Sequence, residues 1–190
     1  MKVSVIGSGR WGTFIAWYLN SIGHEVTLCG RAGSESLTLL QKTRKNKLLT
    51  LPDRVAIATL PDGLLEAEII LVSVASQALG SLLQGTTEQI AGKPLVLCMK
   101  GLESKTGRRL SQIAQAETKG ACPVAVWLGP GHVQEFIKGV PNCMVIDSQD
   151  DSLKHCLVEA FSSDLIRFYY GQDMLGNEIG ATAKNVVGIA

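Results

Sequence analysis

The chain has 190 residues, of which 46% are hydrophobic and 18% are charged, and its formal net charge is +1. This composition supports one domain with a sizeable core and argues against a disordered chain. It also argues against nucleic acid as a partner, because proteins that follow a phosphate backbone carry a marked basic excess. No apolar run is long enough to span a membrane and no secretory leader precedes the first strand-like run. We therefore expect a cytoplasmic protein without a membrane partner.

Five cysteines are scattered along the chain, and their number is odd. No two of them form a Cys-x-x-Cys pair, so neither a zinc site nor thioredoxin-like chemistry is expected. Most lie in apolar runs, where a reduced thiol behaves as a small hydrophobic group. This usage fits the cytoplasm and predicts no metal site.

Short β-branched apolar runs alternate with longer helical patterns along the chain. Strands are predicted at 2–7, 25–29, 55–59, 69–74, 94–99, 123–129, 142–147 and 165–170. Helices are predicted at 11–22, 34–47, 76–91, 106–118, 150–162 and 174–190. Several strands are apolar at consecutive positions, which suits strands covered on both faces. The alternation predicts an α/β fold, a doubly wound Rossmann-type sheet that is mostly parallel.

A glycine-rich turn follows the first predicted strand and opens the first helix. Gly7, Gly9 and Gly12 have the G-x-G-x-x-G spacing. The first allows a tight turn, the second lets the backbone approach a pyrophosphate, and the third lets helix and strand pack closely. The helix start then offers free N–H groups to phosphate. In this context the spacing indicates dinucleotide binding, and the alternative is a tight turn without a ligand.

The end of the second predicted strand bears on which dinucleotide is bound. NAD enzymes usually place a carboxylate about 20 residues beyond the glycine turn, where it binds the ribose hydroxyl. Here the sequence reads Leu28-Cys29-Gly30-Arg31, with an arginine and no carboxylate. A guanidinium there can pair with a 2′-phosphate, so we favour NADP and leave NAD open. The alternative is that Arg31 is a solvated loop charge.

Three further loops follow predicted strands and carry polar residues, at 73–77, 99–103 and 129–135. In doubly wound sheets, ligands lie beyond the carboxyl ends of the strands. Lys100 is the most suggestive residue, because it follows an apolar strand directly and precedes a glycine. An ammonium group at that position would point toward the ligand crevice.

The last predicted helix carries a lysine among small residues. Gly176, Gly180, Lys184 and Gly188 are spaced by four and therefore share one face. Glycine costs about 0.8–1.0 kcal/mol relative to alanine inside a helix, so this face needs a close approach. A substrate with a nicotinamide ring and a closely packed second helix are equally good explanations from the helix alone.

Taken together, these motifs resemble the bacterial-type NAD(P)-dependent glycerol-3-phosphate dehydrogenases, over the whole chain. The similar segments are GSGRWGT at 7–13, GHEVTL at 23–28, MKGLE at 99–103, GPGHVQE at 129–135, KGVP at 138–141 and GNEIGATAKNVVGIA at 176–190. The last segment is the most specific.

The resemblance implies roles for individual residues. Arg10 and Trp11 in the glycine turn would contact the dinucleotide together with Arg31. Lys100 would contact both the cofactor and the substrate. Lys184 corresponds to the catalytic lysine of the family, with Asn185 as its neighbour in the catalytic set.

The loop after the sixth predicted strand would line the nicotinamide and substrate pocket. Within it, Val133 is expected to contact the cofactor, and Gly129 and Gly131 the substrate. Two departures from the family are visible. Ala75 stands where the family often has proline, and Gly131 stands where it usually has serine or threonine, which removes a hydroxyl contact to substrate.

The resemblance also implies a domain division, with a dinucleotide-binding domain at 1–172. The segment at 173–190 would be the first helix of a second, all-helical domain that is truncated here. We therefore expect dinucleotide binding with little turnover from these residues.

The reaction implied by the resemblance interconverts dihydroxyacetone phosphate and sn-glycerol 3-phosphate by hydride transfer with NADPH or NADH. The expected partner is this small phosphate substrate, in phospholipid biosynthesis, and a homodimer is left open. One alternative is a related two-domain reductase of another small substrate. A second alternative is a dinucleotide-sensing module without chemistry.

Overall fold

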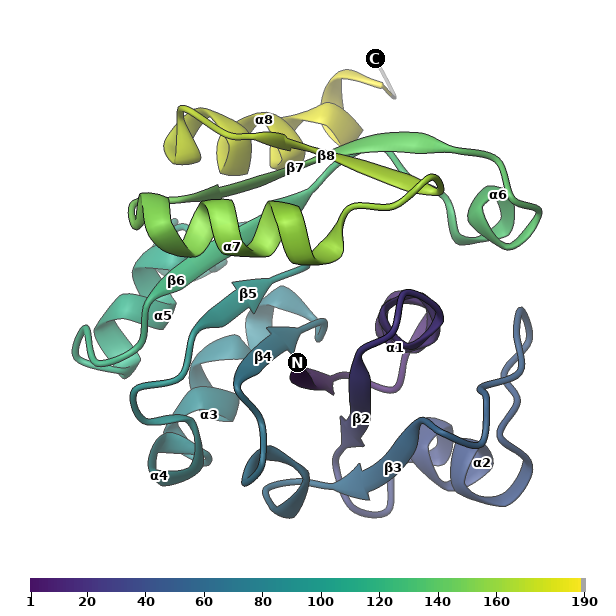
Figure 1. Cartoon of the computed structure of the whole chain (residues 1–190). Coiled ribbons are helices and arrows are strands. Elements are labelled where there is room, and N and C mark those ends of the chain that lie inside the picture. The colour runs from purple at the N-terminus through teal and green to yellow at the C-terminus, as the bar shows by residue number, and fades with distance from the viewer. Residues whose placement is uncertain (189–190) are drawn as a thin grey trace.

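One eight-stranded sheet runs through the part of the chain that the structure describes, residues 1–188 without the side chains of residues 185 and 186 (Figure 1). In this computed structural model the strand order is β3-β2-β1-β4-β5-β6-β7-β8. The strands are β1 (Lys2–Ile6), β2 (Glu25–Gly30), β3 (Ala56–Thr59), β4 (Ile69–Val72), β5 (Leu95–Leu97), β6 (Val124–Leu128), β7 (Asn142–Ser148) and β8 (Ile166–Tyr170). Neighbouring strands are parallel except β6 and β7. The predicted doubly wound, mostly parallel sheet is confirmed.

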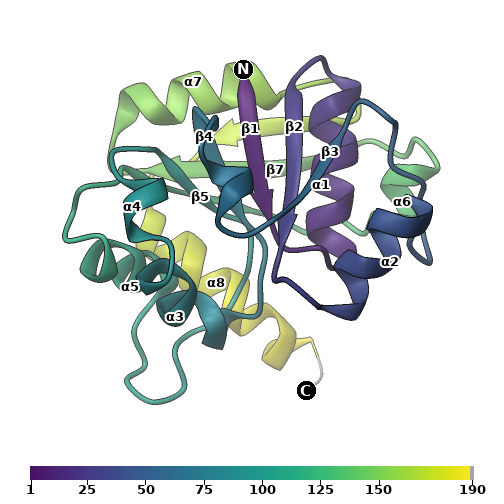
Figure 2. The same cartoon turned by 90° about the horizontal axis from the view of Figure 1, so that it is seen from below.

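Helices cover both faces of this sheet, as Figure 2 shows. The α-helices are α1 (Arg10–Ser21), α2 (Glu35–Thr43), α3 (Leu79–Gln84), α4 (Thr87–Ile90), α5 (Leu110–Glu117), α6 (Val133–Ile137), α7 (Asp151–Phe161) and α8 (Met174–Val187). Two short 3-10 helices are η1 (Asp62–Leu64) and η2 (Ser76–Ala78). One apolar cluster lies under α1, α6 and α7, and a second lies under α3, α5 and α8. Of the helices described, none has the length and hydropathy of a membrane span.

The strands divide their side chains between these two clusters. In β4 all four residues are buried, with Ile69 and Leu71 in the first cluster and Ile70 and Val72 in the second. Successive side chains of a strand point to opposite faces of the sheet, so a strand between two helical layers must be apolar throughout. This requirement explains the consecutive apolar runs in the sequence.

Three predicted helices differ from the observed ones. The helix predicted at 76–91 is wrong as one element, because η2, α3 and α4 divide it and the chain breaks at Gly85 and Thr86. The helix predicted at 106–118 begins only at Leu110, since Gly107 has a positive φ in the loop before it. Helix α2 ends at Thr43 because Arg44 adopts the left-handed conformation.

From β1 the chain adds β2 and β3 on one side of the sheet, and it then returns to add β4 on the other side of β1. The strands β1 and β4 are therefore parallel neighbours although β2 and β3 separate them in the chain. The loops after these two strands leave the sheet on opposite sides, and this is where doubly wound folds bind ligands. The glycine turn follows β1 and the 73–77 loop follows β4, so both lie at this point.

Helix α8 packs on the sheet, over β6 and β7. Met174 and Ala181 contact the apolar cluster under α3 and α5. Helix α8 is therefore held against the sheet by contacts within the described part of the chain. The predicted domain division after residue 172 stays a prediction.

Candidate functional site: a groove along the carboxyl ends of the strands

The glycine turn is shaped by close backbone contacts. Gly7 has a φ of 125°, and a Cβ there would lie 2.1 Å from the carbonyl oxygen of Ser73. A Cβ on Gly12 would lie 1.9 Å from the carbonyl oxygen of Gly7. Neither position accepts a larger residue, because the two clashing carbonyl groups belong to backbone that directly follows β4 and β1 and cannot move away. These two glycines therefore shape the turn itself.

Gly9 lies in open space, unlike Gly7 and Gly12, and this space decides whether the turn fits a phosphate. Gly9 is the N-cap of α1, and no described atom lies within 4 Å of the position a Cβ would take. In the described part of the chain no side chain caps this helix start. Free N–H groups and open space at a helix N-terminus suit an anionic group. The turn thus fits a dinucleotide pyrophosphate.

A cavity of about 700 Å³ lies on one side of the turn. Gly7, Gly9 and Arg31 line it, together with Ser34 and Ser36 at the start of α2. Among the described residues that line it there is no carboxylate. The cavity therefore offers a guanidinium and hydroxyl groups, and no negative charge, to an adenosine ribose and its 2′ substituent.

A second cavity, of about 380 Å³, lies on the other side of the turn. Gly9, Arg10 and Trp11 line it from the turn, and Lys100 lines it from the loop after β5. The remaining lining residues are Ser73, Val74, Cys98, Met99, Trp127, Leu128, Gly129, Gly131 and Met144. Most of these are apolar, which suits a flat aromatic ring such as nicotinamide.

A third cavity, of about 270 Å³, lies between this loop region and α8. Lys100 and Lys184 line it, with Gly176 and Gly180 on the same face of α8 as Lys184. No described atom lies within 4 Å of a Cβ built on Gly180, whereas one on Gly176 would lie 2.3 Å from Asp173. Gly180 therefore leaves space at the cavity, while Gly176 lets the Asp173 carboxylate accept a bond from the Gly176 N–H, 2.9 Å long.

The two lysines give the third cavity a positive potential. Lys100 donates a hydrogen bond from its Nζ to the carbonyl oxygen of Gly129, over 3.2 Å. Burial lowers the pKa of Lys100 below its usual value, and the nearby charge of Lys184 lowers it further. Two like charges facing one cavity repel each other until an anion neutralises them. The cavity is thus suited to a small phosphate or to a developing oxyanion.

The three cavities adjoin one another, and we call the row that they form the groove. Gly9, Ser73 and Val74 line both the first and the second cavity. Lys100, Leu128 and Gly129 line both the second and the third. A ligand can therefore extend from Arg31, across the glycine turn, to the two lysines.

The structure brings together most of the residues singled out from the sequence. Gly12 lies buried beneath the turn and does not line the groove. Val133 is buried in the apolar cluster under α1 and is not among the lining residues of these cavities, so its side chain does not face the groove. The side chain of Asn185 lies outside the described part of the chain.

The missing hydroxyl at Gly131 has a physical cause. A Cβ on Gly131 would lie 2.2 Å from the ring of Phe136, which is buried and stacked on Phe14 with the ring centroids 5.0 Å apart. Serine or threonine at this position would require the ring to move. The loop therefore offers its backbone to the groove and no hydroxyl from residue 131.

Two polar residues of α8 were not singled out from the sequence. Glu178 is a buried carboxylate, and Asn177 lines the third cavity. A carboxylate on the inward side of an amphipathic helix is a signal that could have identified Glu178, since unpaired buried carboxylates are rare.

Comparison with known proteins agrees with this geometry. The sequence model for the NAD-dependent glycerol-3-phosphate dehydrogenase N-terminus matches residues 2–154. The glycerol-3-phosphate dehydrogenase [NAD(P)+] of Pelodictyon phaeoclathratiforme is 34% identical over 197 residues, which cover all of this chain and 59% of that relative. The corresponding enzyme of Corynebacterium urealyticum is also 34% identical, over 196 residues, with 100% and 59% covered. The chain thus spans about 59% of the length of these relatives.

Solved structures give the same result. The crystal structure of glycerol-3-phosphate dehydrogenase from Coxiella burnetii superimposes with a TM-score of 0.90 and 26% identity, over 99% of this chain and 59% of that one. A putative F420-dependent NADP reductase from an Arthrobacter strain has a TM-score of 0.70 at 19% identity and shares the fold alone. The chain belongs to the NAD(P)-dependent glycerol-3-phosphate dehydrogenase family of oxidoreductases.

Proposed function

We propose that the groove binds NADPH or NADH, and that its far end is the site where dihydroxyacetone phosphate and sn-glycerol 3-phosphate are interconverted. The observation that carries the proposal is the row of three adjoining cavities from Arg31 to the two lysines. The glycine turn lies where the first two cavities meet, which is where a dinucleotide has its pyrophosphate.

Each part of the groove has a task in binding. The N–H groups at the start of α1 would hold the pyrophosphate, and Arg31 would pair with a 2′-phosphate. Trp11 and Met144 would enclose the nicotinamide, because both line the second cavity. When bound, this ring supplies or accepts the hydride. The walls would thus hold the ring near Lys100, which lines both the second and the third cavity.

The two lysines would perform the proton and charge chemistry. In the reducing direction the carbonyl oxygen of dihydroxyacetone phosphate gains negative charge, which Lys100 would stabilise. Lys184 would donate a proton from its Nζ to that oxygen, and would accept the proton in the reverse direction. The open space at Gly180 would admit the three-carbon chain beside Lys184.

We also propose that these 190 residues bind cofactor but turn over slowly. Lys184 is exposed, so the third cavity leaves this lysine open to solvent. Positioning of a reactant contributes many orders of magnitude to a rate, and a phosphate without an enclosing site is poorly positioned.

The test is a turnover assay with three proteins. The chain itself, a chimera that continues it with the remaining part of the Pelodictyon phaeoclathratiforme relative, and that relative are assayed with dihydroxyacetone phosphate and NADPH. We expect the chimera to turn over, the chain to be much slower, and Lys184→Ala to abolish turnover of the chimera. A chimera that binds cofactor without turnover would favour the dinucleotide-sensing alternative, and an active Lys184→Ala chimera would remove the proposed role of the lysine.

A further inference from the structure

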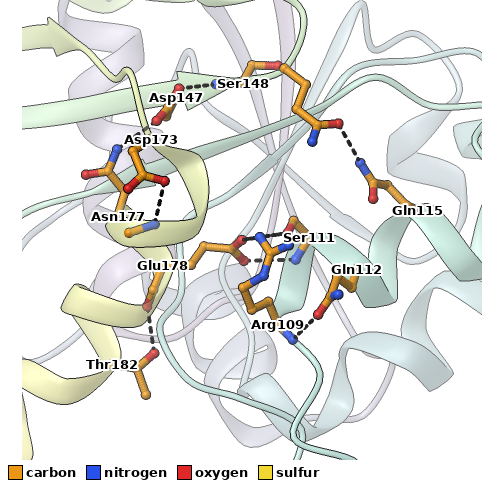
Figure 3. A network of polar contacts seen from close by, with 12 residues as sticks. Arg109, Ser111, Gln112, Gln115, Asp147, Ser148, Asp173, Asn177, Glu178 and Thr182 are labelled. Carbon is orange, nitrogen blue, oxygen red and sulfur yellow. Dashed lines mark hydrogen bonds and ion pairs between the residues drawn. The ribbon is translucent and has the colours of Figure 1, made fainter.

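Helix α8 is held by two polar anchors that lie on neighbouring residues. Glu178 is only 7% exposed, and its carboxylate accepts hydrogen bonds from Arg109 Nη1 (2.6 Å), Ser111 Oγ (2.6 Å) and the Ser111 N–H (3.0 Å). Figure 3 shows these contacts between α8 and the start of α5. The Ser111 N–H belongs to the first turn of α5, where a helix favours a negative charge. This carboxylate is therefore fully paired although it is buried.

The second anchor is on a neighbouring face of the helix. Asn177 donates a hydrogen bond from Nδ2 to Asp147 Oδ2 on β7, over 2.7 Å. Asp147 is 2% exposed, and its other oxygen accepts from the Ser148 N–H and lies 3.8 Å from Lys154 Nζ. Gly171 makes room for this carboxylate, because a Cβ there would lie 2.2 Å from the Asp147 carboxyl carbon.

Together the two anchors determine the rotation of α8 about its own axis. Neighbouring helical residues point about 100° apart, so Asn177 and Glu178 fix α8 against two different elements, β7 and α5. Lys184 comes seven residues after Asn177, which is two turns along the same face and about 10 Å further on. Asn177 and Lys184 accordingly line the same cavity. A helix turned by one residue would direct Lys184 away from it.

We propose that Glu178 is a positioning residue, which holds Lys184 opposite Lys100 through its bonds to Arg109 and Ser111. This inference rests on the proposed function, in which the two lysines share one site. Glu178 does not line the groove, so its effect reaches the site only through the rotation and docking of α8. Asn177 and Asp147 assist by holding the neighbouring face of α8 against β7.

The proposal is tested by measuring the pKa of Lys100, which depends on the nearby charge of Lys184. Lys184 contributes to the lowered pKa of Lys100, whose usual value is 10.5. The pKa of Lys100 is measured by NMR on the chain after isotope labelling of its lysines, with Lys100→Arg for assignment. Lys184→Met removes the neighbouring charge and thereby sets the full size of the expected rise.

Glu178→Gln is expected to give at least half of the rise produced by Lys184→Met. Ser111→Ala, which keeps the ion pair and removes one donor, should give a smaller change of the same sign in a chain that still folds. Glu159→Gln, at an exposed carboxylate on α7, is the matched control and should leave the pKa of Lys100 unchanged. Amide exchange in α8 should accelerate about tenfold or more in Glu178→Gln, while exchange in β1 and β4 stays the same.

A merely structural role for Glu178 would destabilise the whole fold and leave the pKa of Lys100 unchanged in the folded molecules. An unchanged pKa in both Glu178→Gln and Ser111→Ala would therefore overturn the proposal. NADPH binding is titrated in parallel on the unchanged chain. A failure to bind would count against the proposed function, whereas the pKa comparison would still decide whether Glu178 positions Lys184.

Discussion

Replacing Gly9 with alanine distinguishes the effect of this glycine on folding from its effect on cofactor binding. The backbone of Gly9 has a φ of −77°, which alanine adopts without strain, and no described atom lies within 4 Å of the new methyl group. Removing a glycine restricts the unfolded chain and raises stability by about 0.4–1 kcal/mol at such a position. We therefore expect Gly9→Ala to fold as well as the unchanged chain, or slightly better.

Cofactor affinity should change in the opposite direction, because the methyl group occupies the space through which a pyrophosphate approaches the N–H groups of α1. A hydrogen bond to a charged group contributes about 1.5–3 kcal/mol, so losing one raises the Kd about ten- to hundredfold. Thermal denaturation gives the stability, and fluorescence titration with NADPH gives the Kd. Gly80→Ala on α3, where a Cβ would make ordinary contacts away from the groove, is the control. A Gly9→Ala chain with unchanged affinity would refute the assignment of the pyrophosphate to this turn.

Three further results are expected. Arg31→Ala should weaken NADPH binding about tenfold and leave NADH binding nearly unchanged, as competitive titration of the two nucleotides will measure. A small phosphate in the third cavity favours charged Lys100, whose pKa is lowered in the free chain. Binding of inorganic phosphate should therefore take up protons near that pKa and weaken as pH rises through it. Calorimetry in buffers of different ionisation enthalpy measures this uptake, and Lys100→Met should abolish it. A thiol reagent at pH 8 should add two labels by mass spectrometry, at exposed Cys143 and Cys156. The other three thiols, of Cys29, Cys98 and Cys122, are buried, and burial raises the pKa of each, for Cys29 to about 12, which leaves them unreactive.

The sequence predicts the sheet well because its strands are buried on both faces. All four residues of β4 are buried, so an uninterrupted apolar run marks the strand without any knowledge of its neighbours. The glycine turn is equally visible, since Gly7 and Gly12 are required by backbone contacts that come from chain geometry. The helices after β4 are less predictable, because η2, α3 and α4 divide one continuous helical pattern of the sequence at Gly85 and Thr86.

The site is predictable where its residues follow strands and unpredictable where it depends on packing. Lys100 was identified because it directly follows the strand predicted at 94–99, although the observed strand β5 ends at Leu97. The role of Glu178 was not, because it depends on Arg109 and Ser111, which are far away in the sequence and meet α8 only in the folded chain. The conflict between a Cβ on Gly131 and the ring of Phe136 is likewise a property of the packed loop.

Titration of the isotope-labelled chain with NADPH and then with NADH tests most directly whether the groove holds a dinucleotide. We predict saturable one-to-one binding, with the largest amide shifts in the glycine turn at 7–12 and at Arg31, Lys100 and Gly129. A folded sample that binds neither nucleotide, or that shifts only at residues remote from the groove, would contradict this function.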